Sequence, residues 1–137
     1  MNTRTFALIW GIGFLLAGLS GFIMATEGTP HPDLTMRHGY GDALGLFPVN
    51  TLHNIVHLLF GVWGLIAYRG GFSSARTYAK AVAIVYALFI VMGLIDGLNT
   101  TFGLVPLYGN DVWLHILLAL PAAYFGFMHR DTASDRS

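Results

Sequence analysis

Four long apolar segments dominate the pattern of hydrophobic and polar positions along this chain of 137 residues. Each is close to the roughly 20 residues that a helix needs to cross a hydrocarbon core of about 30 Å. The loop 26–48 is rich in glycine, proline and aspartate, which favours an irregular outer connection. We therefore expect an all-α, single-domain integral membrane four-helix bundle. The expected spans cover about residues 6–25, 49–68, 78–98 and 112–128.

The positive charges predict how this bundle lies in the membrane. If the chain crosses the membrane four times, six of the seven Lys and Arg residues lie on one side of the membrane, and Arg37 alone lies on the other. Cytoplasmic segments of membrane proteins carry an excess of Lys and Arg. We therefore expect a multi-pass protein of the cell membrane with both termini in the cytoplasm and a cytoplasmic tail at 129–137. The six residues are Arg4, Arg69, Arg76, Lys80, Arg130 and Arg136.

Composition excludes several classes of function. The chain is 55% hydrophobic and only 10% charged, and its seven basic residues are balanced by seven acidic ones. It therefore has no basic surface that could gather the phosphates of a nucleic acid. The absence of cysteine excludes disulfides, thiolate metal ligands and a cysteine nucleophile. Any chemistry has to come from histidine, carboxylate or tyrosine side chains.

Polar side chains at the start of the second span are the most unusual feature of the sequence. Asn50, His53, Asn54 and His57 open a segment that otherwise reads as lipid-embedded. Ionisable groups inside a membrane are costly to keep and usually mark a functional site. Residues four apart share one face of a helix, so His53 and His57 should project together. The same spacing separates Asp111 from His115 near the start of the fourth span.

An internal repeat relates these two groups. The motif Gly-Leu-x-Pro occurs at residues 45–48 and again, 58 residues later, at 103–106. We therefore expect two helical hairpins of the same orientation, related by a pseudo-two-fold axis along the membrane normal. The candidate side chains would then lie at equal depth in the outer half of the bundle. The same offset relates two further pairs, His53 with Asp111 and His57 with His115.

The first hypothesis is a metal site. Imidazole and carboxylate groups on facing helices are the ligands that bind divalent metals in helix bundles. Three histidines with one carboxylate suit tetrahedral zinc, and iron or copper remain open. Such a protein could be a hydrolase or a redox protein, so enzymatic activity is left undecided. The expected ligands are His53, His57, Asp111 and His115, and Asn50, Asn54 and Asp96 are expected to contact and orient them.

Other interpretations stay open. His57 and His115 alone could hold a haem iron from both faces, as in four-helix membrane cytochromes. Alternatively, the polar side chains hydrogen-bond to one another and hold the helices together. That arrangement would suit a non-catalytic accessory subunit that packs against other membrane subunits, or a homo-oligomer. His31 and His38 in the outer loop could cover the cluster, supply extra ligands or remain solvated.

These residues also carry a resemblance to a known family. The motifs are Asn50-x-x-His53-Asn54-x-x-His57-Leu58, Gly61-x-x-Gly64-Leu65 and Asp111-x-x-Leu114-His115. With them, the chain resembles a family of small bacterial four-span membrane proteins that is catalogued as a domain of unknown function. The resemblance covers roughly residues 6–128. It implies a bacterial inner-membrane protein of this topology and implies no activity.

Overall fold

The protein is mostly helical in a computed structural model, which describes residues 1–132. Four helices are each long and apolar enough to cross a membrane, which indicates a membrane protein. The last of them continues beyond Pro121, which lacks an N–H donor, into a short π-helix, Tyr124–Met128. The helices are α1 (Thr3–Ile23), α2 (Thr51–Arg69), α3 (Gly71–Gly93) and α4 (Asn110–Ala123).

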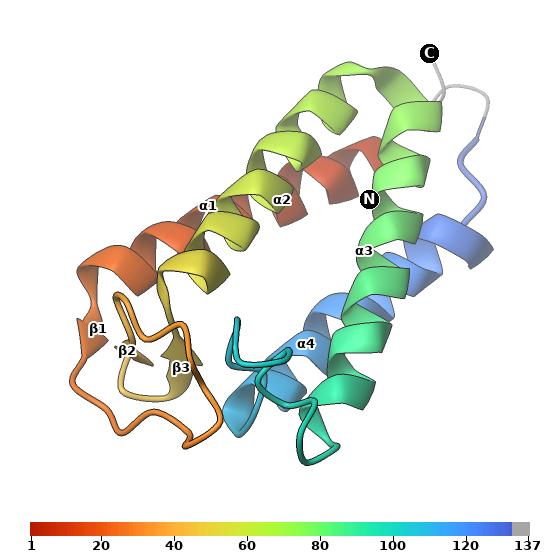
Figure 1. Ribbon diagram of the computed structural model, residues 1–137. Coiled ribbons are helices and arrows are strands. Elements are labelled where there is room, and N and C mark those ends of the chain that lie inside the picture. Colours follow the sequence, from red (N-terminus) through yellow and green to blue (C-terminus); the bar gives the residue numbers. More distant parts are fainter. Residues whose placement is uncertain (133–137) are drawn as a thin grey trace.

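The helices form two antiparallel hairpins, α1 with α2 and α3 with α4 (Figure 1). The Arg4 Nε donates a hydrogen bond to the Tyr68 carbonyl at 3.4 Å, which places the start of α1 beside the end of α2. Similarly, the Arg76 Nε donates to the Gly126 carbonyl at 3.1 Å. The N-terminus and the α2–α3 turn therefore share one end of the molecule with the end of α4. A small sheet and the loop 94–109 form the opposite end.

The residues that follow the π-helix are tied to the start of α1. Asp131 is buried, and its Oδ1 accepts a hydrogen bond from the backbone N–H of Thr3 at 3.0 Å. The same oxygen lies 3.2 Å from the Nε2 of His129. The segment expected as a cytoplasmic tail, 129–137, thus begins as a packed contact with α1. Its residues 133–137 lie outside the described part of the chain.

Glycines let the backbones of α1 and α2 touch. A Cβ atom on Gly11 would lie only 3.0 Å from both the Gly61 carbonyl oxygen and the Leu65 nitrogen. A Cβ atom on Gly64 would lie 2.6 Å from the Cα of Gly11. In lipid, burial of apolar side chains does not drive helices together, because the lipid tails are equally apolar. Close backbone approach stabilises the association through van der Waals contact instead. The hairpin α1–α2 is therefore a rigid support for the side chains that α2 carries.

The third helix differs from the expected third span, 78–98, at both ends. It begins at Gly71, because the polar residues before Tyr78 are satisfied within a helix; the Thr77 hydroxyl, for example, donates to the Ser73 carbonyl at 3.0 Å. It ends at Gly93, where the backbone of Leu107 passes so closely that a Cβ atom would collide with its carbonyl oxygen. Residues 94–98 therefore belong to a turn-rich loop.

Most of the loop expected at 26–48 is irregular, as predicted, but its two ends pair in a short three-stranded antiparallel sheet. Strand β2 pairs with β1 on one side and with β3 on the other, with Ala43 opposite Ala25 and Gly41 opposite Val49. The pairing satisfies backbone donors and acceptors that lie beside apolar helix ends, where an unpaired group would be costly. The strands are β1 (Ala25–Thr26), β2 (Gly41–Ala43) and β3 (Phe47–Val49).

Asn50 locks the two long loops onto the start of α2. Its side-chain Oδ1 accepts a hydrogen bond from the His53 N–H at 2.8 Å, which caps the helix. Its Nδ2 donates to two carbonyls, one in each loop, those of Met36 and Leu104, both at 2.8 Å. The side chain is fully buried. Asn50 thereby fixes where α2 begins, and with it the positions of His53 and His57.

The internal repeat extends from the sequence to the backbone. Three pairs of positions that are 58 residues apart all adopt positive φ angles, a conformation that L-residues rarely take. One pair is non-glycine, Leu44 with φ 56° and Phe102 with φ 57°. The two Gly-Leu-x-Pro segments therefore begin at glycines with the same sign of φ, each preceded by a non-glycine residue with positive φ. The other pairs are Gly39 with Gly97 and Gly45 with Gly103.

Candidate metal centre

Three histidines from two helices converge in the interior of the bundle. His53 and His57 project from the same face of α2, as their spacing predicts, and His115 projects from α4. One ring nitrogen of each lies within 4.8 Å of those of the other two. All three side chains are buried, with at most 5% of their surface exposed. The predicted meeting of His57 with His115 is therefore found in the structure.

The space between the rings fits a single ion. A cavity of about 40 Å³ lies among the three histidines, with room for about one water-sized particle. Zinc–imidazole bonds of about 2.0–2.1 Å would place tetrahedral ligand nitrogens about 3.3 Å apart. The nitrogens are therefore near the required spacing, and modest rotations of the side chains would complete it. Aromatic and loop residues close the cavity: Tyr86, Phe89, Thr101, Val105 and Leu107, together with Val56.

Asp111 lies at the edge of this group. Its Oδ2 is 3.7 Å from the Nδ1 of His53, which is an ion-pair distance and too long for a hydrogen bond. The carboxyl group is 1% exposed and lies at the start of α4. The structure thus places Asp111 beside one of the three histidines, while the three ligand atoms that meet all belong to imidazoles. Its expected role as a fourth ligand stays a prediction.

Several buried polar atoms of this region have no hydrogen-bond partner in the described part of the chain. Buried polar groups are normally paired, and an unpaired one costs about 1–3 kcal/mol. A polar cluster that only held helices together would pair these atoms with one another. Instead the histidines leave nitrogens free. The unpaired atoms are the Nδ1 of His53 and of His115, both amide atoms of Asn54 and the Oδ2 of Asp111.

The three residues expected to orient the ligands have different positions. Asn50 acts indirectly, since it caps α2 and holds the loops. Asn54 is buried against α1, where a Cβ atom on Gly21 would collide with its amide. Asp96 is exposed in the loop after α3, because that helix ends at Gly93. No described hydrogen bond or ion pair joins Asp96 to the histidines, so the structure gives it no contact with the cluster.

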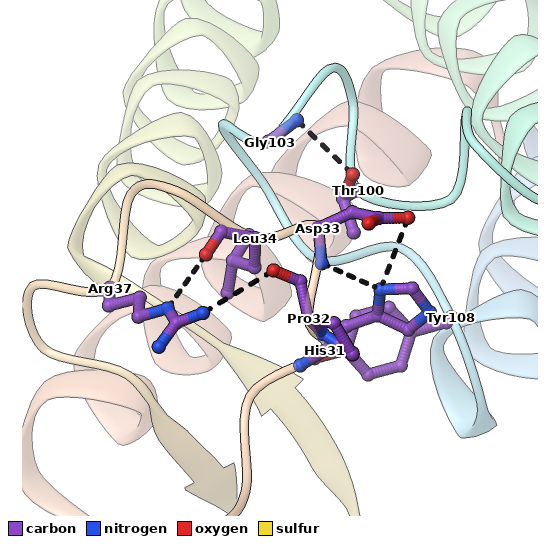
Figure 2. Close-up of polar contacts among 8 residues, drawn as sticks. All are labelled: His31, Pro32, Asp33, Leu34, Arg37, Thr100, Gly103 and Tyr108. Atoms are coloured by element: carbon purple, nitrogen blue, oxygen red, sulfur yellow. Dashed lines mark hydrogen bonds and ion pairs between the residues drawn. The ribbon is translucent and has the colours of Figure 1, made fainter.

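The histidines of the loop between β1 and β2 are engaged elsewhere. The His31 Nδ1 accepts a hydrogen bond from the Asp33 N–H at 3.2 Å, and the His31 ring lies beside that of Tyr108 (Figure 2). The His38 Nδ1 is 2.9 Å from the Thr51 hydroxyl oxygen. Neither residue belongs to the group whose ligand atoms meet. The structure therefore gives no support for extra ligands from this loop.

The space between His57 and His115 favours a single ion over a haem. Pockets for ligands of drug-like size are about 300–1,000 Å³, several times the cavity between the histidines. Aromatic rings occupy the neighbouring space: Phe14 lies 5.7 Å from His57, and Tyr86 lies 4.9 Å from His115, measured between ring centroids. The geometry therefore favours a single ion.

Tyr86 is the residue of this site that the motifs do not indicate. Its ring packs edge-on against that of His115, and its buried hydroxyl has no hydrogen-bond partner in the described chain. Most other tyrosines lie near the ends of spans, where an interfacial position explains them. The position of Tyr86 in the middle of the third expected span is the signal that could have identified it.

One comparison with known proteins gives a result. A family model described as a domain of unknown function, DUF4383, matches residues 4–128, which is most of the chain. No curated protein and no solved structure matches.

Proposed function

The chain belongs to the DUF4383 family, whose function is unknown, and from the geometry of its buried site we propose that it is a membrane protein that binds one divalent metal ion. The ion is held by His53, His57 and His115. The observation that carries the proposal is the convergence of three buried imidazoles around a cavity of the size of one ion. The buried polar atoms of this cluster that lack hydrogen-bond partners in the described chain support it, since a purely structural cluster would pair them.

Zinc is the favoured ion. Nitrogen ligands without thiolates suit zinc, with copper and iron as further candidates. Three protein ligands leave a fourth position for water or a substrate, which is the arrangement of catalytic rather than structural zinc sites. Zinc in such a site would lower the pKa of its bound water to about 7 and so supply a nucleophile.

Asp111 positions His53 in this proposal. Metal-binding histidines usually direct their second ring nitrogen to a carboxylate or a carbonyl, which fixes the orientation of the ring. The 3.7 Å separation between the Asp111 Oδ2 and the His53 Nδ1 requires only a small movement to become such a contact. The alternative is that the same oxygen is the fourth ligand of the ion.

We further propose the orientation predicted from the charges. Four of the five basic residues around the end that contains the N-terminus and the α2–α3 turn belong to α1, α2 and α3, and the loop between β1 and β2, which carries Arg37, lies at the opposite end. The positive-inside rule then places both termini in the cytoplasm. The matching positive φ angles 58 residues apart support a pseudo-two-fold relation between the hairpins. The five basic residues are Arg4, Arg69, Arg76, Lys80 and Arg130.

Zinc titration of the metal-stripped protein tests this proposal. We expect one zinc ion per chain, and we expect Asp111→Asn to weaken binding about 10- to 100-fold, because that is the usual effect of removing a carboxylate that orients a ligand. The measurement is competition with a chelator of known affinity. Asp96→Asn is the matched control, since Asp96 is exposed outside α3.

Two results would count against the proposal. A properly folded wild-type protein with no zinc binding would favour a structural polar cluster, as in an accessory subunit. Equal effects of the Asp111 and Asp96 substitutions would remove Asp111 from the site.

A further inference from the structure

A second, larger cavity adjoins the candidate metal centre. It has a volume of about 210 Å³ and lies where α1, the sheet and α4 meet. His57 and Asp111 belong to its wall, so it reaches the proposed metal site from the side of α1. Its other lining residues are small or apolar, apart from one serine. They are Ala17, Ser20, Ala43, Leu44, Phe47, Val49 and Leu114.

This cavity continues into a groove on the outward surface of α1. The groove and the cavity share Ala17, Ser20 and Leu44. The remaining groove residues are apolar and partly or largely exposed: Leu16, Leu19, Ile23 and Met24. Because α1 is long and apolar enough to span a membrane, this surface would face acyl chains. A ligand would therefore reach His57 from the lipid, by way of the groove on α1.

The polar groups of the cavity suit a hydrogen-bond donor. The Oδ2 of Asp111 is buried without a hydrogen-bond partner in the described chain, and a carboxylate oxygen can accept from a ligand as well as from His53. The Ser20 hydroxyl already donates to the Ala17 carbonyl at 2.8 Å. A hydroxyl group on a ligand could donate to Asp111 and so satisfy an oxygen whose burial is otherwise costly.

The side chains of the lining offer no cation to an anionic head group. None of the lining residues of the cavity or the groove is Lys or Arg. Arg37, the one basic residue of the outer loop, donates to the Leu34 and Pro32 carbonyls (Figure 2). In the metal-free protein, a phosphate brought into this cavity would lose its hydration without gaining a cationic side chain as a partner. The ligand is therefore uncharged at its polar end.

Size completes the description of the ligand. A volume of about 210 Å³ is below the range of about 300–1,000 Å³ that encloses a whole drug-sized molecule. It holds a small head group and the first carbons of a chain. The chain itself then lies in the open groove along Leu16, Leu19 and Ile23.

We propose that this cavity binds an uncharged membrane lipid with a hydroxyl-bearing head, such as a diacylglycerol. The hydroxyl lies beside His57 and Asp111, and the acyl chains lie in the groove on α1. The inference rests on the proposed metal site in one respect, because it names the class of substrate that would reach the ion. The cavity is lined by protein side chains alone, so binding of the lipid can be tested without the ion.

Lipid retention in native mass spectrometry tests the inference. The detergent-solubilised, metal-stripped protein would be titrated with dioctanoylglycerol and, separately, with dioctanoyl phosphatidate as the anionic counterpart, so that neither lipid can bind through a zinc ion. We expect the diacylglycerol to bind at least about tenfold more tightly, as fits one buried hydrogen bond to a carboxyl group. Phosphatidate binding of equal or greater affinity would overturn the proposal in favour of an anionic lipid.

A substitution that fills the cavity provides a second test of the lipid site. Ala17→Phe is expected to weaken diacylglycerol binding about tenfold or more, because Ala17 lines both the cavity and the groove. Ala81→Phe is the matched control, since Ala81 is half-buried on α3 and lines none of the described cavities. Equal effects of the two substitutions would contradict the assigned position.

Photolabelling of the wild-type protein keeps the test decisive if Ala17→Phe does not fold. Dioctanoylglycerol with a diazirine in its acyl chain should label the segment 16–24 of α1, and labelling confined to other helices would overturn the proposal. Zinc content separates the two proposals. Zinc binding without diacylglycerol binding would support the metal site and contradict the lipid site. Diacylglycerol binding without zinc binding would support the lipid site and contradict the metal site.

Discussion

Replacing His115 with alanine is expected to reduce zinc affinity by more than about 100-fold, since loss of a ligand exceeds the 10- to 100-fold loss seen when an orienting partner is removed. His115 is the single histidine that α4 contributes to the group, and the other two lie on α2. Without it, one helix alone holds the ion. Metal content by elemental analysis, together with chelator competition, measures the effect.

Two further variants separate the loss of a ligand from the loss of the fold. His115→Ala also leaves a void beside Tyr86, which by analogy with buried large-to-small changes costs about 2–5 kcal/mol. His115→Gln retains more of the volume and should lose zinc just as severely. His129→Ala is the matched control, because His129 lies at the other end of the molecule beside Asp131. Normal zinc affinity in a folded His115→Gln protein would contradict the ligand assignment.

The second large effect is expected at the α1–α2 contact. Gly11→Leu should destabilise the bundle by about 3 kcal/mol, at the upper end of the usual range for overpacking. The reason is that its Cβ atom would meet backbone atoms of α2, the Gly61 carbonyl oxygen and the Leu65 nitrogen, which cannot rotate away. The two helices would have to separate, and His53 and His57 would move with α2.

Gly13→Leu is the matched control on the same helix. A Cβ atom at Gly13 would meet nothing within 4 Å, and leucine forms helices better than glycine does. Its unfolding free energy should therefore stay the same or rise slightly. The measurement is unfolding in mixed micelles, followed by circular dichroism. Equal stability of the two leucine variants would show that the glycine contact does not hold the hairpin together.

The sequence predicts the parts of the site that depend on helical periodicity. Residues four apart must share a face, so the joint projection of His53 and His57 follows from their spacing alone. The offset of 58 residues relates His57 to His115, and the structure does bring these two together. Four apolar segments of membrane-spanning length likewise become four helices.

Features that depend on contacts between distant segments are not predictable in this way. The helix α3 ends at Gly93, where the backbone of Leu107 passes closely, and Asp96 lies outside the helix. The sheet forms because β2 finds partners on both sides, and its strands are too short to produce an alternating pattern. The contact of Tyr86 with His115 depends on how the two helices pack.

Zinc K-edge X-ray absorption of the wild-type protein tests the central claim most directly, because it reports the atoms that surround the ion. We predict three imidazole nitrogens at about 2.0–2.1 Å together with one oxygen at a similar distance. The imidazole count should fall in His115→Gln. A protein loaded with one equivalent of zinc whose ion is surrounded by oxygens alone would contradict a metal centre built from His53, His57 and His115.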